Sequence, residues 1–508
     1  MTLVPEMPLT VGSASDRVGS VETFDSLNPA NGELVATFPV QSAEEVAAAV
    51  ARAREAFAWW QEQGWDGRKQ HLRAWKAVIA RRIHELAELV HRENGKPHED
   101  AILEITLAVD HIEWAARRAP KVLGQRRVRS GLMAANQAAY VEYQALGVIG
   151  VIGPWNYPVF TPMGSLAYAL AAGNAVVFKP SEFTPAVGRW LEHAWQQAVP
   201  ARPDVLQVVT GLGETGAALV RAGVDKVAFT GSTATGKKVM AACAESLTPI
   251  LMECGGKDAL IVADDADVAE AADAALWGAM SNAGQTCIGI ERVYATAPVY
   301  DEFVAQLRSR AALLRPGSDL DADYGPITMP SQIDIIKRHI ADAVSRGGRV
   351  VTGGQVEGGY VEPTVLVDVP EDSAAVQQET FGPTITVTRV ATVDEAVARA
   401  NDTAYGLAGA VFTRSKSLGM DLARRMKSGM TSINSVIAFA SVPTLPFGGV
   451  GDSGFGRIHG EDGLKEFTRA KAITRQRFAL PTPLMTFQRS PQLTDQLAKV
   501  VGMLHGRG

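Results

Sequence analysis

The stretch GVIGVIGPWNYP, residues 147–158, decides the fold class of this chain. Its first six residues are glycine or branched aliphatic residues, which is typical of a strand buried on both faces. The prolines at 154 and 158 then break the strand and fix a loop around Asn156. A helical pattern over 163–172 and an apolar strand over 175–178 follow, so the chain reads strand, loop, helix, strand.

The same alternation continues for two more units. Strands are predicted over 205–209 and 226–229, and helices over 185–198, 215–222 and 233–244. Four strands that alternate with helices predict an α/β fold with a parallel sheet covered on both faces. Such sheets bind ligands beyond the carboxyl ends of their strands. The loops after Ile152, Phe178, Val209 and Phe229 are therefore the ones to inspect.

The totals exclude several classes of protein. A chain of 508 residues is long enough for two or three domains, and its net charge of −6 gives no basic face for nucleic acid. Three cysteines are too few for a disulfide framework and favour a reducing, cytoplasmic compartment. No histidine pairs with a cysteine or a second histidine at metal-ligand spacing, so no metal site is predicted.

No targeting or membrane segment is predicted. Residues 1–26 lack the apolar core of a secretory signal. Residues 143–178 contain no charged residue or histidine, but Pro154, Pro158 and Pro162 interrupt them. A membrane helix needs about 20 continuous apolar residues, so this run is interpreted as buried strand, loop and helix.

The regions on either side of the alternating units have simpler patterns. Residues 28–32 predict a turn between short strands, and residues 42–123 have helical periodicity. Short strands are predicted over 126–128 and 140–143. Downstream, a helix over 266–280 and a strand over 292–295 flank the turn SNAGQTCI, residues 281–288.

Cys287 lies in that turn of small residues. A thiol held there, next to a free backbone N–H, suits nucleophilic acyl chemistry. The alternative is a cysteine that serves as a small core residue. The choice depends on whether the rest of the chain supplies partners.

Two glycine-rich loops are candidates for phosphate binding. Gly211 to Gly216 fits G-x-G-x-x-G between a strand and a helix, but no acidic residue follows at the required position. The loop 230–238 nearly matches a nucleotide-triphosphate loop. Lys238 stands where a hydroxyl should hold Mg²⁺, which argues against an ATPase. Gly231 and Ser232 still open a helix, and a helix N-terminus is a good seat for a pyrophosphate.

Three other loops carry polar side chains. Lys179 and Glu182 are either a solvated pair or a grip on ribose hydroxyls, and Glu182 would then repel a 2′-phosphate. Asn156 is either a turn residue or a rigid oxyanion donor. Glu253, beside two glycines, is either a solvated carboxylate or a general base with a raised pKa.

Taken together, these motifs resemble the aldehyde dehydrogenase superfamily. The matching segments, in chain order between about Asn28 and Thr474, are 153–156, 179–182, 229–232, 253–257, 282–287, 379–383, 401–407 and 446–450. Each segment alone is a modest signal, but eight in the family's order are very specific.

The resemblance implies a three-domain α/β fold. It assigns 1–125 and 147–254 to a Rossmann-type cofactor domain and 255–445 to an α/β catalytic domain. A small β oligomerisation domain would use 126–146 and 470–480, residues 446–469 would line the site, and 481–508 would form a tail. Homodimers or homotetramers are implied, with a small aldehyde as substrate, no nucleic acid and no transmembrane segment.

The resemblance also implies roles for individual residues in NAD binding, with NADP as the alternative cofactor. Cys287 would attack the aldehyde, Asn156 and the Cys287 N–H would hold the oxyanion, and Glu253 would activate water. The implied cofactor-binding residues are Ile152, Trp155, Lys179, Ser181, Glu182, Gly211, Gly231, Ser232, Glu379 and Phe381. Gly211 would lie in a side wall near the adenine, Glu182 would favour NAD, and Glu379 and Phe381 would place the nicotinamide ribose and ring.

The chain departs from the family pattern at two positions. Cys254 stands where a leucine is usual, which adds a second thiol near the site. Ile458 stands where many members carry a glutamate that relays protons, and Glu461 is a candidate substitute. The Gly-x-x-His-Gly ending favours fatty or aromatic aldehydes, whereas the segment 287–292 resembles succinate-semialdehyde dehydrogenases.

Two other functions compete with hydrolytic aldehyde oxidation. Coenzyme A rather than water would resolve the thioester in an acylating enzyme, but Glu253 argues against this route. A non-catalytic binding protein on the same fold is disfavoured by the intact trio of Cys287, Glu253 and Asn156.

The tail contains an apolar stripe made of Leu493, Leu497, Val500 and Val501. It predicts a surface helix that packs on the protein or on a partner subunit, and a membrane-touching helix is the weaker alternative.

Overall fold

The computed structural model of the chain describes residues 22–131, 134–480 and 485–506. Most of the segment 1–26, where no secretory signal is predicted, lies outside the described residues, as do parts of the tail. Within the described ranges, no helix is both long and apolar enough to span a membrane.

The first sheet has six strands in the order β19-β9-β8-β5-β6-β7. They are β5 (Val148–Ile152), β6 (Ala175–Lys179), β7 (Leu206–Val208), β8 (Lys226–Gly231), β9 (Ile250–Cys254) and β19 (Gly454–Phe455). All neighbours are parallel except β19, which runs antiparallel to β9. The predicted parallel α/β sheet is confirmed. Because β9 continues to Cys254, Glu253 lies within a strand and not after one.

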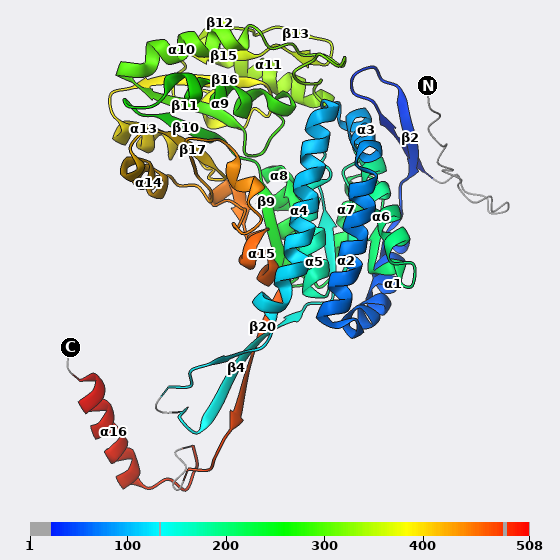
Figure 1. Ribbon diagram of the computed structural model, residues 1–508, viewed down its shortest axis with the longest axis vertical. Helices are drawn as coiled ribbons and strands as arrows, with labels where there is room; N and C mark the ends of the chain where they lie inside the picture. Colours follow the sequence, from blue (N-terminus) through cyan, green and yellow to red (C-terminus); the bar gives the residue numbers. More distant parts are fainter. Residues whose placement is uncertain (1–21, 132–133, 481–484, 507–508) are drawn as a thin grey trace, which may run out of the picture.

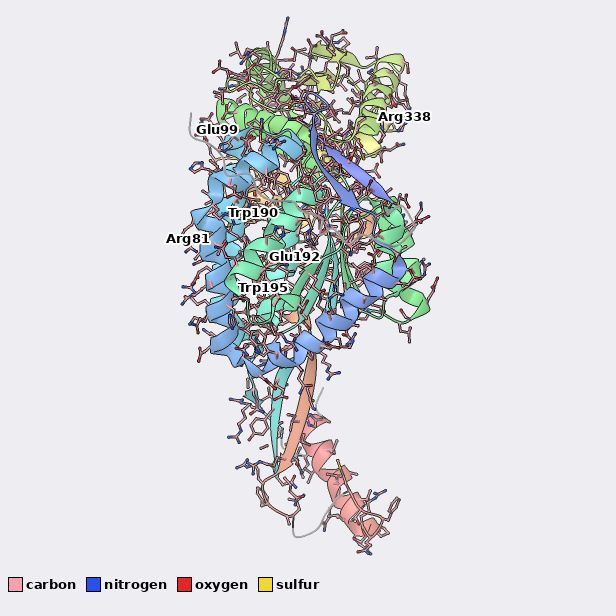
Figure 2. The ribbon with its side chains drawn as sticks, turned by 90° about the vertical axis from the view of Figure 1, so that its right-hand side faces the viewer. Arg81, Glu99, Trp190, Glu192, Trp195 and Arg338 are labelled. Atoms are coloured by element: carbon pink, nitrogen blue, oxygen red, sulfur yellow. The ribbon has the colours of Figure 1, made fainter. Side chains whose placement is uncertain are left out.

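Helices cover both faces of this sheet (Figure 1). They are α1 (Ala43–Glu62), α2 (Gly64–Arg81), α3 (Ile83–Asn94), α4 (His98–Leu123), α5 (Phe160–Ala172), α6 (Pro185–Ala198), α7 (Gly213–Arg221) and α8 (Thr233–Glu245). Alternate strand residues point to opposite faces: Ile149 packs into a core with α4, α5 and α6, while Val148 packs into a second core with α1 and α7. Figure 2 shows Trp190, Glu192 and Trp195 along α6, and both tryptophans are buried.

The second sheet has seven strands in the order β12-β15-β16-β11-β10-β17-β18. They are β10 (Asp258–Val262), β11 (Ile290–Thr296), β12 (Arg349–Thr352), β15 (Thr364–Val367), β16 (Thr384–Val390), β17 (Gly409–Phe412) and β18 (Ser432–Ile433). Its helices are α9 (Val268–Met280), α10 (Ala297–Ala311), α11 (Pro330–Ser345), α12 (Ala374–Gln377), α13 (Val393–Ala400) and α14 (Lys416–Arg425). The later helix α15 (Gly460–Glu466) belongs to the first lobe, where it contacts α4 and α5. This sheet and its helices form the upper lobe in Figure 1.

Two small antiparallel hairpins lie outside these sheets. One consists of β1 (Thr23–Leu27) and β2 (Leu34–Pro39), which confirms the turn predicted over 28–32. The other is a short pair, β13 (Val356–Glu357) and β14 (Tyr360–Val361).

A three-stranded ribbon projects from the body (Figure 1). It consists of β3 (Arg126–Val128), β4 (Gln137–Ala145) and β20 (Thr468–Gln476), in the order β20-β4-β3. Most of its side chains are exposed or half-buried in the single chain. These are the strands that the family resemblance assigns to oligomerisation, and that role stays a prediction.

The tail ends in helix α16 (Pro491–His505), beyond the ribbon (Figures 1 and 2). The predicted helix is present, but none of its residues is buried. Packing of its stripe of Leu493, Leu497, Val500 and Val501 on the body of its own chain is therefore wrong. The reason is distance, since the ribbon carries α16 away from the two lobes.

Candidate active site

The loop that carries Cys287 begins where α9 ends. Residues Ser281–Gly284 form a short 3-10 turn in which Asn282 (φ 53°) and Ala283 (φ 56°) adopt left-handed backbone geometry. This geometry is unfavourable for residues with a Cβ and needs compensation. The buried Asn282 amide supplies it by donating to the carbonyls of Asn156 at 3.0 Å and Gln285 at 3.2 Å.

Gln285 fixes the second half of the same loop. Its Nε2 donates to the Asn282 carbonyl at 2.9 Å, and its Oε1 accepts from the Thr328 N–H at 2.8 Å. The residue is 1% exposed, so these bonds form away from water. Cys287 follows two residues later and is half-buried as a residue.

Asn156 reaches this loop from the first sheet, in the segment after β5. Its Nδ2 donates to the Gln285 carbonyl at 2.9 Å, and the residue is 3% exposed. A carboxamide has two N–H groups, so this bond leaves the second N–H for another acceptor. The amide predicted as an oxyanion donor is thus attached to the loop of the predicted nucleophile.

Glu253 lies on β9 and is 2% exposed. Neither of its carboxylate oxygens has a hydrogen-bond partner within the described part of the chain. Burial raises the pKa of Glu253 to about 7, against the opposing influence of the Cys287 thiol and the Thr230 hydroxyl. A buried carboxyl without partners, titrating near neutrality, is suited to take up protons.

The Cys287 thiol and the Glu253 carboxyl each change the pKa of the other. Burial, and then the nearby Glu253 carboxylate, raise the pKa of the Cys287 thiol well above its usual value. In the free protein the thiol therefore keeps its proton, and attack on a substrate requires that this proton move to a base. The Glu253 carboxylate is close enough to the thiol to affect its pKa, so it can accept the thiol proton.

Two glycines bring Glu253, Glu379 and Cys287 together. A Cβ on Gly255 would collide with the Glu379 carboxylate, and a Cβ on Gly256 would lie 2.8 Å from the Cys287 carbonyl oxygen. The Glu379 carboxylate accepts from the Gly256 N–H at 3.0 Å. Only glycine permits this close approach, which explains the pair after Glu253 and Cys254.

The second thiol, Cys254, points elsewhere. A Cβ on Gly236 of α8 would lie 3.1 Å from its sulfur, so the Cys254 side chain faces the underside of α8. Burial raises the pKa of Cys254 to about 12. Alternate residues of a strand point to opposite faces, so Cys254 points away from the side of β9 on which Glu253 meets Cys287.

The predicted ribose grip lies at the end of β6. Lys179 is 4% exposed, and its Nζ lies 3.9 Å from Glu182 Oε2, whose side chain is 41% exposed. Ser181 Oγ also donates to the Glu182 carboxylate, at 3.3 Å. The aliphatic part of Lys179 runs close to Gly216 and Ile152, which brings β5, β6 and the start of α7 to one place.

Both glycine-rich loops start helices at the same edge of the sheet. Ser232 caps α8 by accepting from the Thr235 N–H at 3.3 Å, and the side chains at 232, 234 and 235 are exposed or half-buried. Gly211 has φ +149°, where a Cβ would collide with Thr215 Oγ1. Gly211 thus permits the turn into α7, and Gly231 precedes the accessible start of α8.

Trp155 and Phe381 join the two lobes. Their rings pack edge to face, with centroids 5.6 Å apart and an interplanar angle of 86°. Phe381 has φ 51°, and its N–H donates to Glu291 at 2.9 Å. Burial, and then the charge of Glu291, raise the pKa of Glu379 to about 8. Trp155 and Phe381 therefore bring a loop of each lobe into contact.

Several buried charged residues had no predicted role. Lys257 Nζ donates to Glu291 and Thr380, and Glu291 accepts from the Thr380 and Phe381 N–H groups, which fixes the loop with Glu379. A second pair, Lys96 and Glu104, holds the loop around Asn156. Periodicity gave no signal for either pair, because a charged residue in a sequence is expected to be exposed.

The residue proposed to replace the missing proton relay does not lie in the site. The Glu461 side chain is 52% exposed and pairs with Arg118 at 3.4 Å on the surface, so this substitution is wrong. Ile458 instead pairs through its backbone with Phe447. The neighbouring His459 is buried, with its ring centroid 3.9 Å from that of His111.

Among the described residues, no group of three His, Cys, Asp or Glu side chains is arranged to hold a metal ion.

The fold and these motifs are those of known aldehyde-oxidising enzymes. Residues 17–473 match the aldehyde dehydrogenase family. This protein belongs to the aldehyde dehydrogenase family and is an oxidoreductase acting on aldehydes.

Individual relatives agree with this assignment. The chain is 38% identical over 464 residues to a mitochondrial aldehyde dehydrogenase of Leishmania tarentolae, and the match covers 89% of this chain and 92% of the relative. It is 36% identical to the 4,4'-diapolycopene aldehyde oxidase of a Methylomonas species, over 90% of this chain and 87% of that one. The crystal structure of PnpE with nicotinamide adenine dinucleotide superposes with a TM-score of 0.87 at 33% identity, covering 92% of this chain and 96% of that chain.

Proposed function

We propose that this protein oxidises an aldehyde to its carboxylic acid with NAD, through a thioester on Cys287 that water then hydrolyses. The observation that supports this most strongly is the arrangement around the thiol. A buried carboxyl without hydrogen-bond partners, Glu253, and a fixed amide, Asn156, both lie against the loop of a half-buried cysteine. Nucleophile, base and oxyanion donor are the groups that acyl chemistry requires.

The edge of the first sheet fits a dinucleotide. The accessible first turn of α8, with Gly231 and Ser232, presents free N–H groups to a pyrophosphate. Lys179 and the open carboxylate of Glu182 suit ribose hydroxyls, and Glu182 disfavours a 2′-phosphate. Glu379 lies against Gly255, close to Glu253, and Phe381 follows two residues later in the same loop. There they would hold the nicotinamide ribose and ring. Bound there, NAD would accept a hydride from the carbon that Cys287 has attacked.

The first step proposed is attack by the thiol. As Cys287 Sγ bonds to the aldehyde carbon, its proton moves to Glu253, because the buried carboxylate has both oxygens free. The carbonyl oxygen gains negative charge, and the second N–H of Asn156 together with the Cys287 N–H stabilises it. The rigid loop keeps these donors in place, so little reorganisation is needed when the charge develops.

The second step proposed is hydrolysis of the thioester. Once the proton taken from the thiol has been released to solvent, Glu253 takes a proton from water and the resulting hydroxide attacks the acyl carbon. The acid then leaves, and the Cys287 sulfur takes a proton back from Glu253 to restore the thiol. A pKa of about 7 makes Glu253 a better base than an exposed glutamate while leaving much of it ionised at neutral pH. This role favours water over coenzyme A as the acceptor.

We further propose that the substrate is an apolar aldehyde. Cys287 packs against a core whose aromatic members include Phe160, Phe439 and Phe447. The buried lysines of the loops around the site are already paired with carboxylates, Lys96 with Glu104 and Lys257 with Glu291. A substrate carboxylate would therefore lack a counter-ion, whereas a hydrocarbon chain or ring would not need one. The likeness to an oxidase of the diapolycopene aldehyde supports the same choice.

A cytoplasmic homodimer or homotetramer, assembled through the ribbon of β3, β4 and β20, completes the proposal. The ribbon's exposure in the single chain supports it, because exposed strands at the edge of a sheet are ready to pair.

NADH formation tests the function directly. Purified protein is given NAD and equal concentrations of a long aliphatic, an aromatic and a carboxylated aldehyde, each with and without coenzyme A. We expect turnover without coenzyme A and the highest kcat/KM for the apolar aldehydes. Turnover that requires coenzyme A would contradict the role of Glu253, and a preference for the carboxylated aldehyde would contradict the substrate class alone.

A further inference from the structure

Lys96 and Glu104 form an ion pair inside the first lobe. Lys96 Nζ lies 2.6 Å from Glu104 Oε2, and both side chains are fully buried. Removing two charges from water is costly, and such a pair often contributes little to stability. A fully buried pair next to a reaction site therefore calls for an explanation other than stability.

The pair is connected to the segment that carries Asn156 at both ends. Lys96 Nζ donates to the Asn156 backbone carbonyl at 2.8 Å. Glu104 Oε1 accepts from the N–H groups of Val159 at 2.7 Å and Phe160 at 3.0 Å, at the start of α5. One ion pair thus holds both sides of the loop between the oxyanion donor and the helix that follows.

The ring of Tyr157, between these two attachment points, contributes further restraint. Lys96 Nζ lies 4.0 Å from the centroid of this ring, and the Tyr157 hydroxyl lies 3.0 Å from Thr286 Oγ1, next to Cys287. The loop is thereby held by Lys96 on one side and by Thr286 on the side of the nucleophile.

We propose that the Lys96–Glu104 pair positions the Asn156 amide for the reaction at Cys287. The pair acts through the loop backbone and touches no reacting atom, so Lys96 and Glu104 are positioning residues. A small misplacement of a catalytic group can cost up to about 100-fold in rate. Holding the Asn156 amide in place can therefore outweigh the free energy that is lost by burying the two charges. This inference rests on the oxyanion role proposed above for Asn156.

The test removes the hydrogen bond from Lys96 to the Asn156 carbonyl and keeps the hydrogen bonds from the start of α5 to position 104. The variant Lys96→Met/Glu104→Gln is neutral, and the carboxamide oxygen that it introduces at position 104 can still accept from the start of α5. The matched control is Lys76→Met/Glu113→Gln, which removes a half-buried pair of 2.7 Å that also involves α4. Asn156→Ala and the variant that combines all three substitutions complete a thermodynamic cycle.

The measurement is the rate of the first NADH burst with an apolar aldehyde, beside the rate at which iodoacetamide alkylates Cys287. Alkylation creates no oxyanion, so it reports the thiol without the amide. We expect Asn156→Ala to lose about 100-fold or more of the burst rate. The neutral pair variant should lose about 10-fold or more. The variant combining all three should match Asn156→Ala within about twofold, because both changes remove one function.

Alkylation in the neutral pair variant and the burst rate of the control should both stay within about twofold of wild type. If the burst rate of the variant with all three substitutions falls by the product of the two separate losses, this inference is overturned and the proposed function stays intact. A wild-type burst rate in Asn156→Ala would overturn both. If the neutral pair variant does not fold, Lys96→Gln, which removes the ammonium group that donates to the Asn156 carbonyl, replaces it with the same expected and contrary results.

Discussion

The Cys287 loop and the first turn of α8 are built in opposite ways. In the Cys287 loop, Asn282 and Gln285 are buried and each makes at least two hydrogen bonds to neighbouring backbone. At the start of α8, the side chains at 232, 234 and 235 are exposed or half-buried, and Ser232 bonds only within its own turn.

The difference follows from what each region has to do. A nucleophile and its oxyanion donor must hold their geometry while charge develops, which requires fixed dipoles that water does not compete with. A cofactor must enter and leave, which requires N–H groups that are open before it binds. The reacting groups therefore lie on a rigid loop, and the cofactor is expected to bind at a separate, exposed helix start. Substitutions in these two regions should have different consequences.

The largest effect should come from the nucleophile. Cys287→Ser should lower kcat by about 10⁴-fold or more, because a hydroxyl beside Glu253 is a much weaker nucleophile than a thiol. Binding of NAD, followed by quenching of tryptophan fluorescence, should stay at the wild-type level. Weakened NAD binding would show that the two regions are not separate after all.

Glu253→Gln should come next. We expect the steady-state rate to fall by about 10²–10⁴-fold, while one equivalent of NADH still forms slowly per active site as the thioester accumulates. In the wild type, the steady-state rate should rise as pH increases through about 7, since Glu253 must be ionised. A flat pH profile from about 6 to about 8.5 would contradict the assignment of Glu253 as the base.

The same substitution should have the opposite effect on stability. The pKa of Glu253 is raised from 4.5 in the unfolded chain to about 7 in the folded one, so ionisation destabilises the fold as pH rises between these values. Glu253→Gln avoids this cost and should be more stable than wild type above a pH of about 7, by on the order of 2 kcal/mol. Chemical denaturation of both proteins at low and high pH measures the difference, and an advantage that does not grow with pH would contradict it.

A smaller effect is expected in the open region. Glu182→Gln should shift the ratio of kcat/KM for NADP over NAD by about 10-fold towards NADP, because it removes the repulsion of a 2′-phosphate. Its effect on stability should be slight, as the side chain is 41% exposed. Glu214→Gln, an exposed carboxylate in the first turn of α7, is the matched control and should leave the ratio unchanged.

The smallest effect should follow from removal of residues 481–508. Since no residue of α16 is buried, truncation after Leu480 should change the free energy of unfolding of the single chain by no more than about 0.5 kcal/mol. Light scattering and denaturation, measured together, check this. A larger loss accompanied by a smaller assembly would instead place α16 on a partner subunit.

Much of the site was predictable because its signals are local. Cys287, Glu253, Asn156 and the start of α8 stand in short segments next to strand ends, and a parallel sheet brings strand ends to one edge. The alternation of strand and helix after Gly147 was a local signal as well. Boundaries were less secure: Glu253 lies inside β9, where pairing with β8 extends further along the chain than its sequence indicated.

The sequence by itself determined the α/β class, the order of the elements and the residues that carry the chemistry, because periodicity and motif spacing are properties of neighbouring residues. Only the tertiary structure decided the environment of those residues. The burial that raises the pKa of Glu253, the clamp of Lys96 and Glu104 on the Asn156 loop, and the exposure of α16 all depend on residues far apart in the chain. Burial and contact arise only when distant segments pack, so a charged residue in the sequence does not reveal whether it will meet water or another charge.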